Sequence, residues 1–478
     1  MNEVTHQLKL LFERWANESV LNISPLAQSG SYRRYFRIEG KDKKAIGVFN
    51  PDKKENLAFV TFTEHFLKKK LNVPQLFATN LKANIYIIED LGETTLFSLL
   101  KQQNSGSLQK KTTEYYKDAL RQLIRFQLDG GKGLDYSVCY PSKKFDKQAI
   151  LWDLNYFKYY FLKLAKINFD EQKLEEDFNS FADFLLSTES EYFMYRDFQS
   201  RNILVRNGEL YFIDYQGGRK GALQYDVASL LFQAKANLSN KVKEELLDFY
   251  LTNLNQRLNF KQQTFKKYYY GYVLIRLLQT LGAYGFRGYY ENKSHFLLSI
   301  PFALKNLQWL IKDKLIPKKF PELERILNSI IENEEWEKMS VSSNQKLKVT
   351  INSFSYKEGL PKDYSGNGGG FVFDCRVIDN PGRHPDFQNF TGLDRKVIDF
   401  LESKESVRNF LNSVRQIVDS SVENYQKRGF KNLMINFGCT GGQHRSVYCA
   451  ENIAKHLKNN FDVLVEVNHT QLNKKEIL

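Results

Sequence analysis

A short polar stretch, Met339–Gln345, most constrains what this chain can fold into. It follows a charged, helix-like segment and precedes an alternating strand pattern that begins at Leu347. Ser/Asn stretches between segments of opposite periodicity are typical of linkers. With 478 residues, the chain is also too long for one ordinary domain. We therefore predict a first domain over residues 1–338, a linker over residues 339–346 and a second domain over residues 347–478.

The two predicted domains differ in their secondary-structure patterns. Residues 1–90 mix helix and strand patterns, and residues 91–338 are mainly helical with one interruption at 195–221. In the second domain, strand and helix patterns alternate. The sequence thus predicts a small mixed lobe, a larger helical lobe and then a small α/β domain. The predicted elements are helices 4–16, 57–69, 393–402, 405–428 and 446–459, and strands 34–39, 45–49, 85–89, 347–355, 371–378, 431–437 and 461–468.

Composition limits the function classes. The chain carries 69 basic and 55 acidic residues, a net charge of +14, without a block of five or six like charges. RNA stays open as a partner, but this pattern does not support it and fits an anionic small molecule as well. Neither a transmembrane run nor a signal peptide is expected. Four scattered cysteines are too few for a disulfide framework or a zinc site, so we expect a cytoplasmic protein.

The most informative motif runs from Tyr195 to Leu204. Asp197 is followed five residues later by Asn202, and Asp214 comes after the next short strand. Phosphoryl transfer to a hydroxyl needs a carboxylate that orients the acceptor and takes its proton. It also needs oxygen ligands for Mg²⁺ on the ATP phosphates. The spacing assigns the first task to Asp197 and the second to Asn202 and Asp214, as in kinase-like catalytic loops.

This motif belongs to a longer resemblance that spans residues 1–338. The first domain resembles the aminoglycoside-phosphotransferase-like kinases, most closely the branch that phosphorylates the anomeric hydroxyl of N-acetylmuramate and N-acetylglucosamine. The resemblance implies an α+β, protein-kinase-like bilobal fold with an N-lobe over 1–90 and a C-lobe over 91–338. It also implies ATP and Mg²⁺ as cofactors and a small sugar as substrate. The matching stretches are Ser29–Arg37, Ile87–Gly92, Phe145–Asp146, Leu154–Phe157, Tyr225–Leu230 and Arg276–Tyr284.

The resemblance implies further site residues. The loop Ser29, Gly30, Ser31 and Tyr32 would cover the nucleotide phosphates, because backbone N–H groups beside a glycine can approach anions closely. Glu89 would belong to the hinge that pairs with adenine, with an ordinary core strand as the alternative. Asp226 would brace the catalytic loop. The candidate sugar contacts, which could equally be ordinary polar groups of the helical lobe, are Asp146, Asn155, Arg276 and Gln279.

Two departures from the family pattern bear on activity. Tyr195 stands where the family commonly has His, at a position that is usually structural. The strand Ala45–Asn50 lacks the Lys that holds the α- and β-phosphates in a typical kinase, and Lys43 and Lys44 come too early. The sugar-kinase branch also tends to lack this Lys, so its absence fits that branch. The absence of this Lys also leaves open the alternative that the kinase fold is vestigial and inactive.

The second domain carries a separate constellation at Phe437–Ser446, between a predicted strand and a predicted helix. Gly441 and Gly442 let backbone amides converge, and the following helix N-terminus favours an anion. His444 and Arg445 add donors. The stretch therefore predicts an anion-binding loop. Its members are Cys439, Thr440, Gly441, Gly442, Gln443, His444 and Arg445.

This loop has two functional interpretations. The spacing Cys439-x5-Arg445 is that of cysteine-dependent phosphatases, in which a thiolate attacks phosphorus. Over almost the whole domain, however, the sequence resembles the C-terminal domain of the RapZ family of RNase adapter proteins. The matching stretches are Phe373–Arg376, Asn380-Pro381, Thr391–Asp394, Gly438–Tyr448 and His469.

The second resemblance implies a sensor of glucosamine-6-phosphate, and in some members a part in RNA binding. The phosphate would sit on Thr440 to Arg445, while Asp374 and Arg376 could face the sugar. The family's P-loop nucleotide-binding domain is absent, since no Gly-x4-Gly-Lys-Ser/Thr occurs. Ligand sensing is therefore the interpretation that we carry forward.

Taken together, the sequence predicts an ATP-dependent amino-sugar kinase with a fused sugar-phosphate-binding domain, in cell-wall sugar recycling. One alternative is a non-catalytic RNA-binding, adapter or regulatory protein with a vestigial kinase fold. Another is an antibiotic-modifying phosphotransferase, which would need an acidic pocket for a polycationic substrate.

Overall fold

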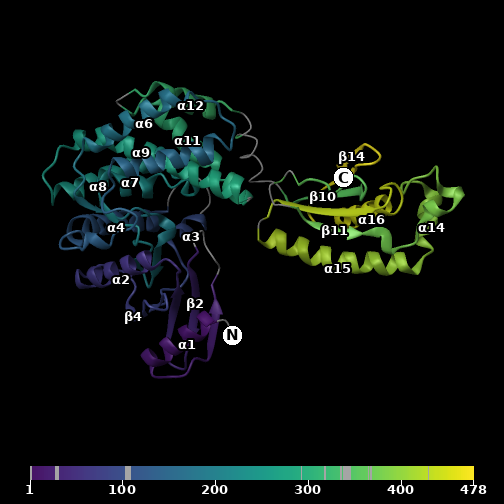
Figure 1. Cartoon of the computed structure of the whole chain (residues 1–478), viewed down its shortest axis with the longest axis horizontal. Coiled ribbons are helices and arrows are strands. Elements are labelled where there is room, and N and C mark those ends of the chain that lie inside the picture. Colours follow the sequence, from purple (N-terminus) through teal and green to yellow (C-terminus); the bar gives the residue numbers. More distant parts are fainter. Residues whose placement is uncertain are drawn as a thin grey trace. The chain divides into compact units, whose positions relative to one another are not determined.

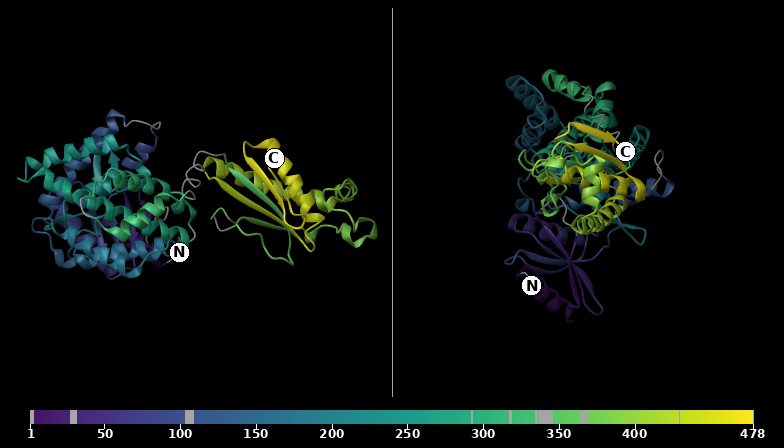
Figure 2. Two further views of the ribbon diagram at one scale, coloured as in Figure 1. Left: turned by 90° about the horizontal axis from the view of Figure 1, so that it is seen from above. Right: turned by 90° about the vertical axis from the view of Figure 1, so that its right-hand side faces the viewer.

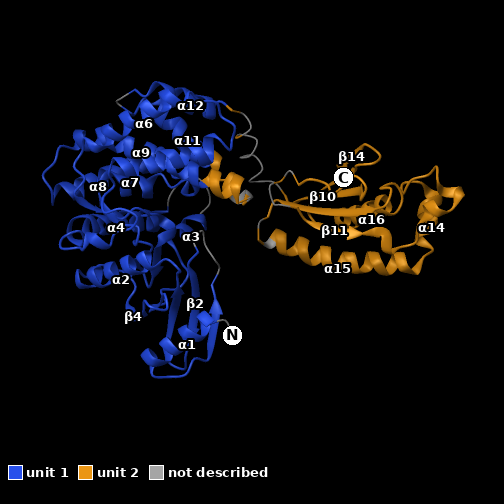
Figure 3. Cartoon of the chain, in the orientation of Figure 1, with its two compact units in different colours: residues 1–283, 302–332 blue, residues 284–301, 333–478 orange. Residues whose placement is uncertain are grey.

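The structure is a computed structural model of the whole chain (Figure 1). It describes residues 3–26, 32–102, 109–291, 293–316, 319–333, 336, 346–363, 365, 369–428 and 430–477. Two compact units are present, one of residues 1–283 and 302–332 and the other of residues 284–301 and 333–478 (Figure 3). Nearly all of the predicted linker, residues 339–345, lies outside the described residues. The division at 338 and 347 stays a prediction.

The first unit begins with a small lobe built on one sheet. Its five strands run antiparallel in the order β1-β2-β3-β5-β4. Leu8 and Phe12 of the first helix pack with Ile38 and Ile87 of the strands, so the apolar face of that helix covers the sheet. The elements are α1 (Glu3–Ala16), β1 (Asn22–Pro25), β2 (Arg34–Glu39), β3 (Lys44–Phe49), α2 (Lys53–Lys68), β4 (Leu76–Asn80) and β5 (Ile85–Ile88).

A mainly helical lobe follows the small lobe, which is purple in the right-hand view of Figure 2. Two short two-stranded sheets, β6–β9 and β7–β8, interrupt the helices between residues 192 and 221. The strands are β6 (Tyr192–Met194), β7 (Ile203–Arg206), β8 (Glu209–Phe212) and β9 (Arg219–Gly221). The helices are α3 (Leu96–Lys101), α4 (Lys110–Arg125), α5 (Lys147–Phe157), α6 (Glu171–Leu186), α7 (Gln224–Leu231), α8 (Asn240–Asn255), α9 (Gln262–Gly285), α11 (Ile300–Lys312) and α12 (Pro321–Ile331). The short helix α10 (Ser294–Leu297) belongs to residues 284–301, which group with the second unit.

The second unit contains a five-stranded sheet in the order β11-β12-β10-β13-β14, parallel except for the last strand. Val349, Ile351 and Val467 point to the face on which the helices pack, and Leu411 and Ile453 of α15 and α16 belong to the same core. The elements are β10 (Lys348–Ser355), β11 (Phe371–Asp374), α14 (Arg395–Glu402), α15 (Glu405–Lys427), β12 (Asn432–Cys439), α16 (Arg445–Asn460), β13 (Leu464–His469) and β14 (Lys474–Ile477).

The expected fold class is confirmed: a bilobal α+β unit is followed by an α/β domain. The predicted strand 371–378 is too long, because the strand ends at Asp374. The Asp374 carboxylate accepts a hydrogen bond from the N–H of Arg376 and turns residues 375–377 into a 3₁₀ helix. The short strands β1, β4 and β14 were not predicted.

All four cysteines, Cys139, Cys375, Cys439 and Cys449, are buried free thiols. Among the helices of the described residues, none combines the length and the hydropathy that crossing a bilayer requires.

Candidate functional site

The structure brings together the three residues of the predicted phosphotransfer motif. The chain leaves β6, passes Asp197 and enters β7 directly after Asn202. The Asn202 side-chain amide donates to the backbone carbonyl of Asp197 at 2.9 Å and to Asp214 Oδ2 at 3.3 Å. One buried amide therefore links the proposed base to the proposed metal ligand.

A fully buried carboxylate holds the catalytic loop from behind. Asp226, at the start of α7, accepts hydrogen bonds from the N–H groups of Tyr195 (2.8 Å) and Arg196 (2.9 Å). Burial raises the pKa of Asp226 to about 7, and these two hydrogen bonds oppose the rise. Arg196 has a φ of 79°, a conformation that non-glycine residues rarely adopt. The two hydrogen bonds thus stabilise a strained backbone next to Asp197, as the sequence analysis expected for Asp226.

The Arg196 side chain is anchored in the helical lobe. Its Nη2 lies 2.7 Å from Asp153 Oδ1 of α5, and its guanidinium carbon lies 5.0 Å from the ring centres of both Phe145 and Tyr225. The other Asp153 oxygen and the second guanidinium nitrogen are buried without a hydrogen-bond partner among the described residues. Such an oxygen can accept a hydrogen bond from a bound polar ligand, and such a nitrogen can donate one to it.

Two of the four candidate sugar contacts lie beside Asp197. Arg276 of α9 approaches Asp197 Oδ1 with its Nη2 at 3.5 Å and donates its Nε–H to the Ser229 hydroxyl at 3.1 Å. The Gln279 side-chain oxygen accepts a hydrogen bond from Arg276 Nη1. The predicted acceptor side of the site therefore carries a buried positive charge next to the proposed base.

The other two candidates are placed differently. Asp146 is the N-cap of α5, and its carboxylate accepts the N–H of Ala149 at 3.0 Å. Asn155, near the C-terminal end of α5, keeps a buried side-chain oxygen without a partner among the described residues. Asp146 thus has a structural task of its own, whereas Asn155 has an unused acceptor. Contact of either residue with a sugar stays a prediction.

On the nucleotide side, Ser29, Gly30 and Ser31 lie outside the described residues, and Tyr32 is 84% exposed. Glu89 follows β5, and its Oε1 lies 2.6 Å from Arg206 Nη1 of β7. Its backbone N–H donates to the carbonyl of Gln75 at 3.0 Å. The side chain of Glu89 therefore ties the small lobe to the helical lobe. Because its N–H is already used, a hinge role would fall to other backbone groups of this segment.

Sequence reasoning missed a pair of residues close to Asp214. Arg33 lies directly before β2, and its two terminal nitrogens are 2.9 Å from Glu55 Oε2 of α2 and 3.5 Å from Asp214 Oδ1. In the sequence, Arg33 stood out only as one residue of the matching stretch Ser29–Arg37, and Glu55 belonged to no motif. Glu55 lies 22 residues after Arg33 and Asp214 lies further along the chain, so no local sequence motif includes these contacts.

The residues around Asp214 fit a magnesium ion. Asn202 uses its amide nitrogen for the two hydrogen bonds above, which leaves its side-chain oxygen for a cation. Asp214 adds carboxylate oxygens. Mg²⁺ is typically held in proteins by one or two such oxygen ligands together with substrate phosphates and water. Asn202 and Asp214 would hold it here.

In the second unit, the predicted anion loop connects β12 to α16. Thr440, Gly441 and Gln443 are exposed, and a Cβ at Gly441 would meet no atom within 4 Å. The helix N-terminus follows at Arg445, so backbone N–H groups and the helix dipole favour an anion at this end of the sheet. The exposed part of the loop is therefore accessible to a ligand.

Other members of the loop are engaged in its own structure. The buried Cys439 thiol accepts the N–H of Gly442 at 3.2 Å and lies 3.2 Å from the Ser446 hydroxyl. A ring nitrogen of His444 lies 3.1 Å from the carbonyl of Phe387. The thiol is thus enclosed, whereas an attacking thiolate needs access to its substrate.

Arg445 points away from the exposed part of the loop. It is buried, and its Nη1 donates to the backbone carbonyls of Arg376 (3.3 Å) and Ile378 (3.1 Å). Asp374 and Arg376 form a half-exposed ion pair, with Arg376 Nη2 at 2.7 Å from Asp374 Oδ2. The Arg376 guanidinium carbon lies 4.1 Å from the centre of the Tyr356 ring. These contacts give Arg445 a structural role and leave Asp374 and Arg376 accessible.

We expect replacement of Arg445 with Met to destabilise the second unit by about 2 kcal/mol, because two buried carbonyls lose their donor. Urea unfolding monitored on the second unit measures this change. As a control, Arg395→Met removes an exposed arginine that is paired with Asp399. An unchanged unfolding midpoint in R445M, with a loss of anion binding, would contradict the structural role and restore Arg445 to the binding loop.

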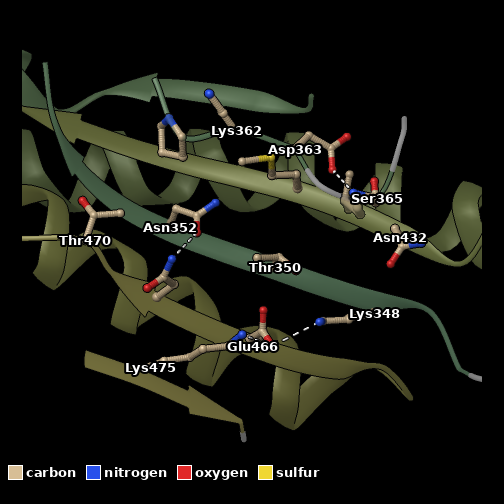
Figure 4. Close-up of a pocket in the computed structure, with 14 residues that line it drawn as sticks. Lys348, Thr350, Asn352, Lys362, Asp363, Ser365, Asn432, Glu466, Thr470 and Lys475 are labelled. Carbon is tan, nitrogen blue, oxygen red and sulfur yellow. Dashed lines mark hydrogen bonds and ion pairs between the residues drawn. The ribbon is translucent and has the colours of Figure 1, made fainter. Parts of the chain in front are cut away.

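A cavity of about 530 Å³ lies on the face of the second sheet opposite α15 and α16 (Figure 4). Asn352 donates to Asn436 at 2.8 Å and accepts from Asn468 at 3.3 Å, so three parallel strands share a chain of amides. Glu466 lies 3.1 Å from both Lys348 and Lys475. These amide and charged side chains therefore contact one another, and the predicted anion loop is not part of the cavity lining.

Two family models match the chain. The model described as the phosphotransferase enzyme family matches residues 22–260, and the model described as the RapZ C-terminal domain matches residues 347–473. The first covers Asp197, Asn202 and Asp214, and the second covers the whole anion loop. Each match falls on the part of the chain for which the resemblance was expected.

Curated relatives match about a quarter of the chain. A nucleotide-binding protein of Actinobacillus pleuropneumoniae is 38% identical over 133 residues, which are 28% of this chain and 44% of that protein. A nucleotide-binding protein of Rhodococcus erythropolis is 36% identical over 132 residues, 28% of this chain and 42% of that protein. The chain thus spans less than half the length of these relatives.

Among solved structures, an ethanolamine kinase of Plasmodium vivax matches 65% of this chain and 89% of its own, with 14% identity and a TM-score of 0.45. An aminoglycoside phosphotransferase in complex with ADP and hygromycin B matches 64% of this chain and 97% of its own, with 16% identity and a TM-score of 0.40. The phosphotransferase model spans half of the 478 residues and includes the full constellation around Asp197. The chain belongs to the phosphotransferase enzyme family and carries a RapZ C-terminal domain behind it.

Proposed function

We propose that the chain is an ATP- and Mg²⁺-dependent kinase that phosphorylates a hydroxyl group of an amino sugar, in the cytoplasm and in cell-wall sugar recycling. The observation that carries this proposal is the hydrogen-bonded set Asp197–Asn202–Asp214. A vestigial kinase has no need to keep a base, an amide and a carboxylate in this arrangement. Family membership supports the reaction class.

Each residue has a defined task in the proposed reaction. The Asp197 carboxylate accepts the proton of the acceptor hydroxyl as that oxygen attacks the γ-phosphorus of ATP, the bond from this phosphorus to the β,γ-bridging oxygen breaks, and ADP leaves. Arg276, with its Nη2 at 3.5 Å from Asp197 Oδ1, orients the carboxylate. Asn202 and Asp214 would hold the metal, which would neutralise charge on the phosphates. Asp226 keeps the loop in position through Tyr195 and Arg196.

The charges around Asp197 support a neutral or anionic acceptor. Arg276 contacts Asp197 directly, and Arg196 lies next to it in the chain, paired with Asp153. A polycationic aminoglycoside would meet two buried guanidinium groups there. The unpartnered oxygens of Asp153 and Asn155 instead fit the hydroxyl and amide donors of an amino sugar. We therefore favour the sugar over the antibiotic as acceptor.

For the second domain we propose binding of a sugar phosphate at Thr440–His444, with Asp374 and Arg376 near the sugar. The exposed loop at the N-terminus of α16 supports this role. The relatives are described as nucleotide-binding proteins, but the match covers less than half of each, and this chain has no Gly-x4-Gly-Lys motif. We therefore assign the nucleotide to the first unit and the sugar phosphate to the second.

The test is ATP turnover by the purified full-length protein with Mg²⁺ against N-acetylmuramate, N-acetylglucosamine, glucosamine and a set of aminoglycosides. We expect turnover with an amino sugar and none with the antibiotics. Stimulation by aminoglycosides alone would replace the acceptor that we propose. ATP binding without turnover on any acceptor would instead favour a regulatory or RNA-binding protein with a vestigial kinase fold.

A further inference from the structure

The small lobe has no lysine where a kinase-like fold needs a cation for the nucleotide phosphates. On β3, Ala45, Ile46 and Val48 are buried apolar residues. The register pairs Lys44 with Glu39 and Phe49 with Arg34, so Lys44 lies at the far end of the strand, about 17 Å from the end next to α2. No slip of register brings Lys44 closer. The missing charge must come from another element.

Lys43 is also engaged elsewhere. Its Nζ donates to the backbone carbonyl of Ala16 at 3.0 Å and lies 5.4 Å from the centre of the Trp15 ring. These contacts hold it against the end of α1. Neither of the two lysines near β3 therefore reaches the catalytic residues.

Arg33 is a cation of the small lobe that does reach Asp214. Its side chain is 4% exposed and lies between α2 and the segment after β8. One terminal nitrogen is 2.9 Å from Glu55 Oε2, and the other is 3.5 Å from Asp214 Oδ1 and 3.3 Å from the Tyr35 hydroxyl. Glu55 is itself fixed by a hydrogen bond from the Asn50 side chain at 2.9 Å. The guanidinium is thus held in one orientation, beside the residue proposed to bind the metal.

We propose that Arg33 is the cation that binds the phosphates of the nucleoside triphosphate, supplied from the start of β2 instead of from β3. A guanidinium is always charged and presents several donors in a plane, so it can keep Glu55 and still donate to a phosphate oxygen. Phosphate contacts of this kind are charge-assisted hydrogen bonds. The inference rests on the proposed kinase function and accounts for a site that lacks the usual lysine.

A purely structural role for Arg33, as a tie between α2 and Asp214, would produce the same contacts. The two roles differ in what they do to ligands with and without phosphates. Loss of a phosphate-binding group weakens the binding of ATP and leaves the binding of adenosine unchanged. A structural tie affects both ligands alike, because it distorts the whole cleft.

The experiment is calorimetric binding of ATP and of adenosine to the full-length protein in the presence of EDTA, with Arg33→Gln, Arg33→Lys and Arg34→Gln. Arg34 is the matched control, because its guanidinium lies 4.6 Å from the Phe49 ring and has no part in the site. We expect R33Q to weaken ATP binding about 10- to 100-fold and to change adenosine binding less than about threefold. R33K should restore part of the loss, and R34Q should match wild type.

Equal weakening of ATP and adenosine in R33Q, or no change in either, would overturn the phosphate role while the wild type still binds ATP more tightly than adenosine. If the wild type itself shows no preference for ATP, the proposed kinase function fails and the inference fails with it. If R33Q does not fold, the binding of ATP and adenosine to R33K and to Glu55→Gln decides between the two roles. Glu55→Gln frees Arg33 from its partner and should keep the preference for ATP.

Discussion

Replacing Asp197 with Asn is expected to lower kcat by about 10³-fold or more, while the Kd for ATP stays within about threefold of wild type. The amide has the shape of the carboxylate but cannot accept the proton of the acceptor hydroxyl. The backbone carbonyl of Asp197, which accepts the Asn202 amide, is unchanged, so the loop should keep its conformation. Steady-state turnover and nucleotide binding, measured on the same preparation, separate chemistry from binding.

The matched control for this variant is Asp248→Asn. Asp248 is an exposed residue of α8 that pairs with Lys266 at 2.8 Å, and it should show wild-type turnover. More than about a tenth of wild-type turnover in D197N would remove Asp197 from the role of base. Loss of ATP binding together with turnover would show instead that the substitution disturbs the site as a whole.

Replacing Asp226 is expected to have the largest effect on stability. Asp226→Ala leaves the buried N–H groups of Tyr195 and Arg196 without an acceptor, which should cost about 3–5 kcal/mol. Because these groups hold the backbone next to Asp197, turnover should fall at temperatures at which the variant is still folded. Chemical unfolding and turnover of the same variant, with D248N as control, measure the two effects.

Asp226→Asn tests the pKa of this carboxyl group. Its pKa is about 7 in the folded protein and about 3.8 as its ordinary value, so the folded state binds the proton more tightly. The contribution of Asp226 to stability is therefore present at low pH and is lost as the pH rises from about 4 to about 7. The Asn variant lacks this dependence.

The stability difference between wild type and D226N should accordingly be about 2–3 kcal/mol larger at pH 5 than at pH 8. Urea unfolding at the two pH values gives this difference directly. A difference that does not depend on pH would mean that Asp226 stays ionised throughout, held by its two backbone donors against the effect of burial.

The sequence predicts the parts of this protein that depend on short spacing. Asp197, Asn202 and Asp214 lie within 18 consecutive residues that span one hairpin, so their approach follows from local structure. The long helices α1, α2, α15 and α16 and most strands of the two five-stranded sheets were also predicted, because their periodicity extends over many residues. The helical lobe was predicted only as a mainly helical pattern, without individual helices. The short strands β1 and β4 gave too weak a pattern, since they have only four and five residues.

Contacts between distant segments could not be predicted. Arg276 was proposed as a sugar contact from resemblance, but only the structure brings it to Asp197, 79 residues earlier in the chain. The pair Arg33–Glu55 could not be predicted for the same reason, because the packing of α2 against the sheet determines which charged side chains meet. Conversely, Asp146 was proposed as a sugar contact from resemblance, and the structure places it as the N-cap of α5.

The buried cysteines make the two parts of the chain separately observable. Cys139 belongs to the first unit, and Cys375, Cys439 and Cys449 belong to the second. A buried thiol reacts with an alkylating reagent only when its surroundings open. Mass spectrometry distinguishes the four modified cysteines. The modification rate at Cys139 therefore reports how often the first unit opens, and the rates at the other three report how often the second unit opens, in the intact protein. Ligand added to one unit can be followed in both.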